Sequence, residues 1–301
     1  MRCLLLGATG FIGGHVRACL DTLDCTVRTA SRSGAGTDLR VDLALAGPAG
    51  PLDILREVGP DVVVNATGVT DGTAEDLAAG NVVAVANLLD ALDRYAHPVR
   101  LVHLGSAAEY GVVPAGRPIP ESAPAAPVSA YGMSKLAGTA LVLAARRHGR
   151  PATVLRVFNP LGPGTPGGLL PGRLVGQLTR ARATGQPARV GNLAGHRDFV
   201  DVRDVARAVA AAAASTDRLP GVLNVGSGRA TALRDLAALA AGMAGVAAPM
   251  EDAPGSARSA VVAWQQADIA AIGAALGWAP QIPLDASLRA MGLPAPAPPP
   301  P

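Results

Sequence analysis

The sequence predicts an α/β fold in which a doubly wound parallel sheet is followed by a smaller C-terminal domain. Short apolar runs alternate with helix-like stretches through residues 1–160, and a glycine-rich turn joins the first run to the first such stretch. A Gly/Pro-rich segment then begins after Asn159. This alternation is typical of βαβ units, whose parallel strands carry helices on both faces.

Each predicted element follows from its local pattern. The strands of the first half are short apolar runs: Arg2–Leu6, Thr26–Ala30, Val62–Asn65, Arg100–Leu104 and Thr153–Phe158. The stretches between them have the apolar spacing of a helix face: Ile12–Leu20, Ala74–Leu92 and Ala130–Arg147. Beyond the segment LGPGTPGGLLPG we expect helices over Arg173–Thr184 and Arg197–Ala214, the second preceded by a short strand, and a further strand at Val222–Val225.

These elements predict two domains and a tail. Residues 1–160 and 197–226 form the sheet domain, and residues 161–196 and 227–292 form the smaller domain. Residues 293–301 read LPAPAPPPP, which predicts an extended, disordered tail outside the core.

The composition excludes several classes of protein. The 301 residues carry a net charge of only +3, because 26 basic residues are interspersed with 23 acidic ones. A nucleic-acid-binding surface needs clustered basic residues, which the sequence lacks. The first apolar run ends at a glycine after four residues, too short for a signal peptide or membrane span. The three cysteines lack metal-ligand spacing. We expect a cytoplasmic protein with reduced thiols, no metal site and no nucleic-acid or membrane partner.

The turn GATGFIG lies between the first strand and the first helix. Gly7 permits the tight turn, Gly10 lets the backbone approach a pyrophosphate, and Gly13 lets the helix pack against the strand. A structural turn is the alternative, but the position at the end of a strand favours a Rossmann-type dinucleotide site with the anion at the helix N-terminus. The predicted cofactor-binding residues of this loop are Gly7, Thr9, Gly10, Phe11, Ile12 and Gly13.

The residues around the end of the second strand indicate which dinucleotide binds. An NAD-binding site usually has Asp or Glu there to bond the ribose hydroxyls, whereas this sequence has Arg28 and Arg32. Guanidinium groups suit a 2′-phosphate, so NADP(H) is preferred and NAD(H) remains possible. Solvated surface arginines are the alternative. Asp42, followed by Leu43, could accept from the adenine amine or cap a turn.

Tyr131 and Lys135 form the most specific candidate pair. Lys135 is the only lysine among the 26 basic residues, and it follows Tyr131, one of three tyrosines, by four positions. At i and i+4 the two side chains share one helix face. A free phenol has a pKa of about 10, and a nearby ammonium favours the phenolate. We therefore expect Lys135 to lower the pKa of Tyr131 so that the phenol can exchange a proton with substrate.

Ser106 completes a candidate catalytic trio. It follows the predicted strand Arg100–Leu104, and ligands of open α/β sheets gather where parallel strands end. Its hydroxyl can bond the reacting oxygen of a substrate. His103, inside the strand pattern, is expected to be a satisfied core histidine.

With GATGFIG, Ser106 and the YxxxK pair in this order, the sequence resembles the extended short-chain dehydrogenase/reductase family over residues 1–292. The later stretches GSAAEYG, VFNPLGPG, VGNLAGHRDFVDVRDVARA, LNVGSG and LGWAPQIPL are most similar to its nucleotide-sugar enzymes, GDP-4-keto-6-deoxymannose reductases above all. The resemblance implies an NADPH-dependent nucleotide-sugar 4-ketoreductase acting on a GDP- or dTDP-linked 4-keto-6-deoxyhexose. A nucleotide-sugar epimerase with bound NAD(P) is the alternative, and an NADP(H)-binding redox sensor is an alternative of another class.

The resemblance also implies further site residues. Ala66 and Thr67 of the NATG stretch would line the cofactor, and Asn159 would contact the sugar nucleotide unless it only forms a turn. Arg197 could clamp the diphosphate through two hydrogen bonds, and Glu109 and Arg258 join it as substrate-binding candidates. A homodimer is expected, since members of this family commonly pair through two helices of the sheet domain.

Two alanines separate this sequence from the dehydratases of that family. Dehydratases use two acids directly after the strand-end hydroxyl to eliminate water, and these positions are Ala107 and Ala108 here. The first acid is Glu109. Reduction or epimerisation is therefore favoured over dehydration.

Overall fold

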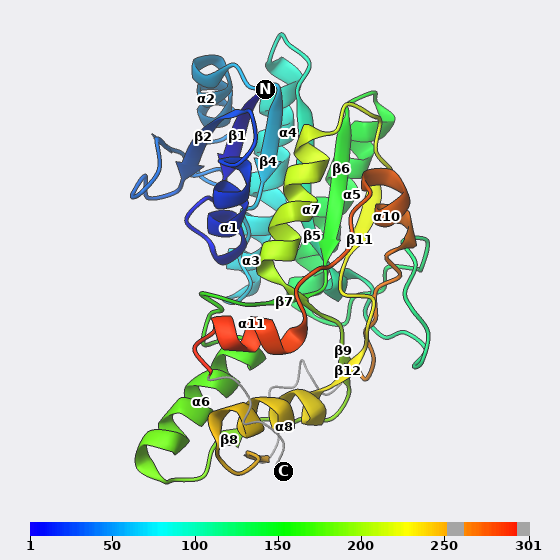
Figure 1. Cartoon of the computed structure of the whole chain (residues 1–301). Helices are drawn as coiled ribbons and strands as arrows, with labels where there is room; N and C mark the ends of the chain where they lie inside the picture. The colour runs from blue at the N-terminus through cyan, green and yellow to red at the C-terminus, as the bar shows by residue number, and fades with distance from the viewer. Residues whose placement is uncertain (252–261, 294–301) are drawn as a thin grey trace.

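The computed structural model describes residues 1–251 and 262–293 and consists of a sheet domain above a smaller lobe (Figure 1). In the sheet domain seven parallel strands run in the order β11-β6-β5-β4-β1-β2-β3. Their bounds are β1 Arg2–Leu6, β2 Thr26–Ser31, β3 Leu39–Arg40, β4 Val62–Asn65, β5 Arg100–Ser106, β6 Ala152–Val157 and β11 Val222–Val225.

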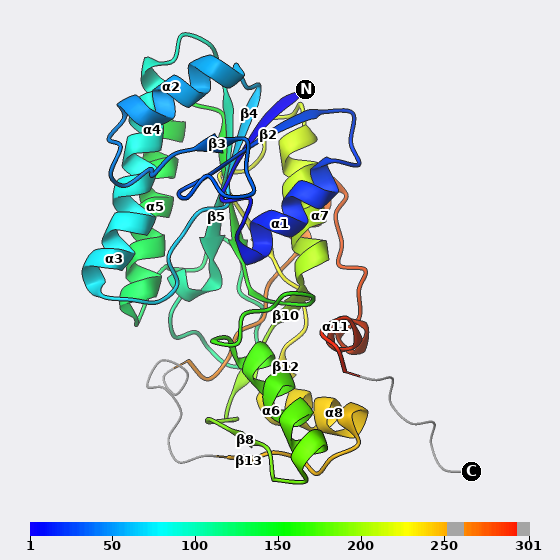
Figure 2. The same cartoon turned by 90° about the vertical axis from the view of Figure 1, so that its left-hand side faces the viewer.

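Helices cover both faces of this sheet (Figure 2). One face carries α1 Phe11–Leu20, α7 Val202–Ala214 and α10 Ala270–Leu276, which pack on a core that includes Leu5, Val102 and Trp278. The other face carries α2 Ala49–Val58, α4 Ala84–Arg94 and α5 Ala130–Arg147. Burial of apolar side chains on both faces explains why the strands are continuous apolar runs rather than alternating ones.

The smaller lobe is built mainly of helices around a second core that contains Leu174, Leu178 and Leu236. Its helices are α6 Leu170–Thr184, α8 Leu233–Ala244 and α11 Leu284–Ala290. Short strands form three further pairs outside the seven-stranded sheet: β7 Asn159–Leu161 with β10 Phe199–Asp201, β9 His196–Arg197 with β12 Thr231–Ala232, and β8 Arg189–Val190 with β13 Met250–Glu251.

The predicted fold class is confirmed, and the differences lie in single elements. The expected helix Ala74–Leu92 is three consecutive segments, α3 Ala74–Ala78, the wider π-helical turn η1 Ala79–Val83 and α4. Helix α2 was not predicted because the glycines and prolines of AGPAGP mask its apolar face. Residues 270–276 were assigned to the smaller domain, but α10 packs on the sheet because Ile272 and Trp278 are buried in its core.

No helix in residues 1–251 or 262–293 is long and apolar enough to span a membrane. Cys3, Cys19 and Cys25 are all free thiols, and Cys3 lies in the core beneath α1.

Candidate active site

The candidate residues of the sheet domain gather at one edge of the sheet. Gly7, Arg32, Ala66 and the residues after Ser106 each directly follow a parallel strand, so the parallel pairing brings them to the carboxyl edge. This edge faces the smaller lobe (Figure 1). Ligands of open α/β sheets bind at this edge.

The glycine loop is built for close approach. The N–H of Gly10 donates to the Gly7 carbonyl at 3.0 Å, and Gly7 has a positive φ of 81°. A Cβ on Gly13 would lie 2.0 Å from the Gly7 oxygen, so only glycine fits there. Helix α1 begins after Gly10 with no side-chain cap and no acid in its first turn. Its free amides therefore suit the pyrophosphate of a dinucleotide.

The two arginines predicted to read the 2′-phosphate lie in different places. Arg32 follows the end of β2 at the carboxyl edge and is exposed. Arg28 lies in mid-strand opposite Leu4, where its Nη2 donates to Glu57 at 3.3 Å. Its Nε lies 4.0 Å from an oxygen of Asp38. Arg28 thus lies beside two carboxylates and three residues before the strand ends, whereas Arg32 lies directly after it; the predicted role of Arg28 toward the 2′-phosphate stays a prediction.

Asp42 and Leu43 follow β3. Asp42 Oδ1 accepts from the N–H groups of Ala44 and Leu45, at 3.0 and 3.1 Å. Asp42 therefore caps a turn, which was one of the two roles expected for it. The Leu43 side chain is buried in the core, and its carbonyl accepts from Asn87 at 2.7 Å. Neither contact tests their predicted role toward the adenine.

Ala66 and Thr67 pack directly against the glycine loop. A Cβ on Gly7 would lie 2.8 Å from the Ala66 oxygen. Thr67 is held by Asn65, whose Oδ1 accepts from the Thr67 N–H at 3.1 Å and from its hydroxyl at 2.6 Å. The other end of the Asn65 side chain pairs with His103 Nδ1 at 3.2 Å. His103 is only half satisfied, because its buried Nε2 has no hydrogen-bond partner among the described residues.

Helix α5 brings Tyr131 to Ser106. Ser129 caps the helix by accepting from the Gly132 N–H at 3.1 Å. A Cβ on Gly132 would lie 2.6 Å from the Ala108 oxygen, so glycine at this position lets the helix meet the turn η2 Ala107–Glu109. Ser106 lies close enough to Tyr131 to lower the pKa of its phenol. The structure thus unites two residues that lie 25 positions apart in the sequence.

The electrostatics of Tyr131 differ from the expectation. Burial raises the pKa of its phenol, the nearby Ser106 hydroxyl lowers it, and the charge of Glu109 raises it further, with a net increase. We expected Lys135 to lower this pKa. The net direction is opposite because burial is the largest effect, so the phenol is held as a proton donor.

Lys135 is a buried cation. Its side chain is 6% exposed, and Nζ donates to the Leu104 carbonyl at 2.6 Å. Burial lowers its pKa to about 8, and the charge of Glu109 opposes that shift. Near neutral pH the ammonium therefore still carries its proton beside the Tyr131–Ser106 pair.

Asn81 was not predicted, yet it shapes the same region. It lies in η1, where its side chain accepts from the Val69 N–H at 2.9 Å and donates to the Val69 carbonyl at 2.8 Å. It also donates to Ser134 Oγ on α5 at 2.9 Å. The signal available in the sequence was a single amide within an otherwise apolar helix face.

The structure corrects the substrate-binding expectation for Glu109. This side chain is fully buried and its oxygens accept from the Ser106 N–H, the Thr139 hydroxyl and Arg156. It is enclosed by the protein, so it has no surface to offer a substrate.

The expected substrate residues of the second half partly converge. The Asn159 amide donates to the Asp198 carbonyl at 3.0 Å, next to Arg197, and to Gln265 at 3.2 Å. Arg197 is 9% exposed, and its Nη1 donates to the His196 carbonyl at 2.9 Å. Gln265 in turn donates to the Ala107 carbonyl at 3.5 Å, which links these residues to the turn η2 that follows Ser106. Arg258 lies outside the described residues.

Asp198 is a second residue that was overlooked. Its buried carboxylate accepts from the N–H groups of Ser227, Gly228 and Ala267, at 2.6, 3.0 and 2.9 Å. It ties the end of β11 to the loop that carries Gln265, although burial raises the pKa of its carboxyl.

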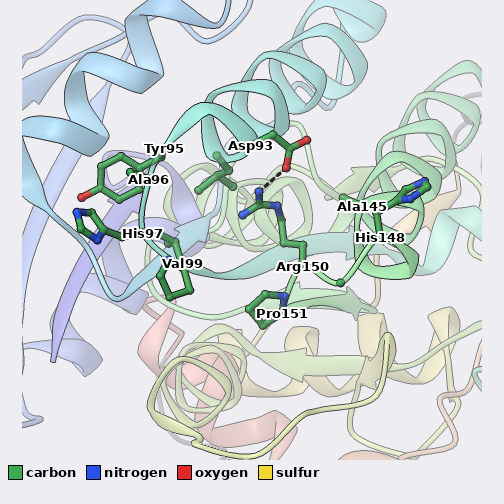
Figure 3. Close-up of a pocket in the computed structure, with 12 residues that line it drawn as sticks. Asp93, Tyr95, Ala96, His97, Val99, Ala145, His148, Arg150 and Pro151 are labelled. Carbon is green, nitrogen blue, oxygen red and sulfur yellow. Dashed lines mark hydrogen bonds and ion pairs between the residues drawn. The ribbon is translucent and has the colours of Figure 1, made fainter.

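A separate cavity of about 420 Å³ lies at the opposite, amino edge of the sheet (Figure 3). It is lined by residues that precede β5 and β6, among them Tyr95, His97, His148 and Arg150, which pairs with Asp93. Its residues come from the ends of α4 and α5 that are remote from Ser106, so it does not belong to the candidate active site.

Comparison with known proteins decides the family. Residues 3–226 match the NAD dependent epimerase/dehydratase family. The chain belongs to this family. It is an NAD(P)-dependent oxidoreductase of the extended short-chain dehydrogenase/reductase type, and the glycine loop with its uncapped helix fits that cofactor class.

Several known proteins are similar to this protein over nearly its whole length. dTDP-6-deoxy-L-talose 4-dehydrogenase (NAD(P)(+)) of Kitasatospora kifunensis is 37% identical over 96% of this chain and 93% of its own length. GDP-6-deoxy-D-mannose reductase of Pseudomonas aeruginosa is 30% identical over 96% and 95%. The structure of RMD from Pseudomonas aeruginosa complexed with NADPH superposes with a TM-score of 0.82 at 29% identity, covering 96% of this chain and 97% of that one.

Proposed function

We propose that this protein is an NADPH-dependent nucleotide-sugar 4-ketoreductase that reduces the keto group of a GDP- or dTDP-linked 4-keto-6-deoxyhexose. The observation that carries the proposal is that α5 meets the turn after Ser106 at Gly132, next to Tyr131, and buries the Lys135 ammonium against the Leu104 carbonyl, two residues before Ser106. Two relatives act on sugar nucleotides of this kind, which supports the substrate class.

The chain supplies the proton and the orientation for such a reduction. When bound, the reduced nicotinamide supplies the hydride. Ser106 holds the carbonyl oxygen, and Tyr131, kept protonated by burial, donates its proton to that oxygen. The Lys135 ammonium stabilises the phenolate that the proton leaves behind. Gly7, Gly10, Gly13, Ala66 and Thr67 would hold the dinucleotide.

The turn after Ser106 favours reduction over dehydration. Ala107 and Ala108 offer neither an acid nor a base, and the nearest carboxylate, Glu109, is paired with Arg156 in the interior. A substrate at Ser106 therefore meets one proton donor, Tyr131, and no second acid–base group from this turn.

The proposal assigns the preference for NADPH to Arg32. Arg32 is exposed after β2, where a 2′-phosphate would lie, whereas Arg28 is held by two carboxylates. On the substrate side, Asn159 and Arg197 are proposed to bind the sugar nucleotide, with Arg258 as a candidate from the sequence.

We also propose a homodimer that pairs through α4 and α5. Val83, directly before α4, is 44% exposed and Met133 on α5 is 57% exposed. The outer face of α5 carries Ala137, Ala140 and Ala144 rather than charges. Light scattering coupled to size exclusion tests this, and a monomer at micromolar concentration would contradict it.

Consumption of NADPH with GDP- and dTDP-linked 4-keto-6-deoxyhexoses tests the function. We expect stoichiometric oxidation and a product two hydrogens heavier by mass. Solvent-deuterium uptake or an isomeric product without NADPH consumption would instead identify an epimerase. NADP(H) binding without turnover on any sugar nucleotide would favour a redox sensor.

A further inference from the structure

Glu109 and Arg156 form an ion pair inside the protein, directly behind the catalytic turn. Their side chains are 0% and 5% exposed, and Arg156 Nε lies 2.7 Å from Glu109 Oε2. Burying two charges is costly, and an ion pair at such depth is a poor source of stability compared with apolar packing. Its place beside Ser106 therefore calls for an explanation other than stability.

Glu109 joins the two elements that carry the trio. Its Oε1 accepts from the Ser106 N–H at 2.8 Å and from Thr139 Oγ1 at 3.0 Å. Thr139 lies on α5, one turn after Lys135. The Glu109 carboxylate thus fixes the position of the end of β5 relative to α5.

Arg156 is held from the opposite side. Its guanidinium lies 4.6 Å from the centre of the Tyr110 ring, and the Tyr110 hydroxyl donates to Asn224 on β11 at 2.7 Å. The Arg156 guanidinium is therefore held by its own strand, β6, and by the Tyr110–Asn224 pair. Because β6 and β11 are neighbours in the sheet, the sheet fixes where the guanidinium lies relative to Glu109.

We propose that Glu109 is a positioning residue that fixes Ser106 against α5 and places a negative charge beside Lys135, with Arg156 as its counter-ion. This inference rests on the proposed function for its meaning in catalysis. Its effect on the charge of Lys135 can be measured without any substrate.

The surrounding charges agree with this assignment. The titratable groups near Lys135 are His103 on β5, Glu109 on η2 and Tyr131 on α5, with Arg156 on β6 behind Glu109. The charge of Glu109 raises the pKa of Lys135 and of Tyr131. It therefore favours the ammonium and the neutral phenol, the two forms that a ketone reduction needs.

The chain offers an unusually clean test because Lys135 is its only lysine. Protein labelled with ¹³C at lysine Cε gives a single NMR resonance, whose pH titration reports the pKa of Lys135. We expect a pKa of about 8 in the wild-type protein. In Glu109→Gln we expect a decrease of about one unit, since removing an opposite charge disfavours the charged form.

Glu121→Gln is the matched control. Glu121 also accepts from a backbone N–H, that of Asn224 at 2.8 Å, but it does not bond Ser106 or α5. We expect the Lys135 resonance to titrate as in wild type. If Glu109→Gln fails to fold because Arg156 is left unpaired, Glu109→Gln/Arg156→Gln removes both charges, and the pKa of Lys135 is expected to lie below wild type there too.

Turnover gives the second readout. In Glu109→Gln we expect kcat for NADPH-dependent reduction to fall about tenfold and its alkaline limb to move to lower pH together with the Lys135 resonance. An unchanged Lys135 titration in both Glu109 variants would overturn the proposal. If the wild-type protein reduces no sugar nucleotide, the proposed function is rejected. A shift of the Lys135 resonance in Glu109→Gln would still support the assignment of Glu109 in that case.

Discussion

The two edges of the central sheet contain the same kinds of side chain in opposite environments. At the carboxyl edge lie Tyr131 and Lys135, whereas the amino edge has Tyr95, His148 and Arg150 around an open cavity (Figure 3). Lys135 is 6% exposed and its pKa is about 8. Arg150 instead pairs with Asp93, whose side chain is 64% exposed.

The direction of the helices reinforces this difference. Helix α1 presents its N-terminal amides at the carboxyl edge, whereas α4 and α5 end at the amino edge with their carbonyls. The first arrangement attracts the phosphates of a dinucleotide and the second repels them. Residue types alone therefore do not make a site; burial and the direction of the helix dipoles decide which edge carries chemistry.

The largest effect is expected from Tyr131→Phe. Removing the phenol should lower kcat by about 10²–10⁴-fold while NADPH still binds, because the variant loses only the proton donor. Steady-state kinetics and a fluorescence titration with NADPH measure the two quantities. Tyr95→Phe at the amino edge is the matched control and should keep kcat within about twofold of wild type. Near-normal turnover in Tyr131→Phe would show that another group donates the proton.

Next in size is the contrast between Gly13→Ala and Gly14→Ala in helix α1. A Cβ on Gly13 would lie 2.0 Å from the Gly7 oxygen, whereas one on Gly14 would find its nearest atom at 3.7 Å. Overpacking costs about 1–3 kcal/mol, so Gly13→Ala should weaken NADPH binding by about tenfold or more. Gly14→Ala should bind normally and gain about 0.5–1 kcal/mol of stability. Equal NADPH affinities in the two variants would argue against the loop as the dinucleotide site.

A smaller effect concerns His103 beneath the carboxyl edge. Burial, with a further contribution from the Lys135 charge, lowers the pKa of His103 well below 6.5. The unfolded chain therefore binds a proton that the folded protein excludes, and the free energy of unfolding falls as pH drops below about 6.5, by at most about 1.4 kcal/mol per unit. Urea unfolding at pH 7.5 and 5.5 measures this. His103→Gln should show a weaker pH dependence, and an identical one would contradict the assignment.

The smallest effect is expected at the amino edge. Asp93→Asn removes a partly exposed ion pair with Arg150, which should change the free energy of unfolding by less than about 1 kcal/mol. Thermal unfolding and kcat are the measurements, and kcat should not change. A clear loss of turnover would mean that the two edges are coupled.

Local patterns predicted the elements that depend on near neighbours in the chain. The strands Arg2–Leu6, Val62–Asn65 and Val222–Val225 and the helix Ala130–Arg147 have the expected bounds. The pairing of Tyr131 with Lys135 on one helix face and the turn at Gly7–Gly13 are likewise properties of short segments. Helix α2 escaped prediction because its Gly and Pro residues conceal the apolar face.

Only the tertiary structure decided which polar residues share an environment. Arg28 and Arg32 look alike in the sequence, but the sheet pairs one with carboxylates and leaves the other exposed at the strand end. Glu109 looked like a substrate residue until β6 brought Arg156 to it, 47 positions away.

The sequence by itself thus determined the βαβ order, the turn of the glycine loop and the placement of Tyr131 and Lys135 on one helix face, because backbone geometry and helical spacing act over a few residues. The tertiary structure decided the direction in which the pKa values of Tyr131 and Lys135 shift and the burial of Glu109. Those properties depend on burial and on charges from distant strands, which no local pattern contains.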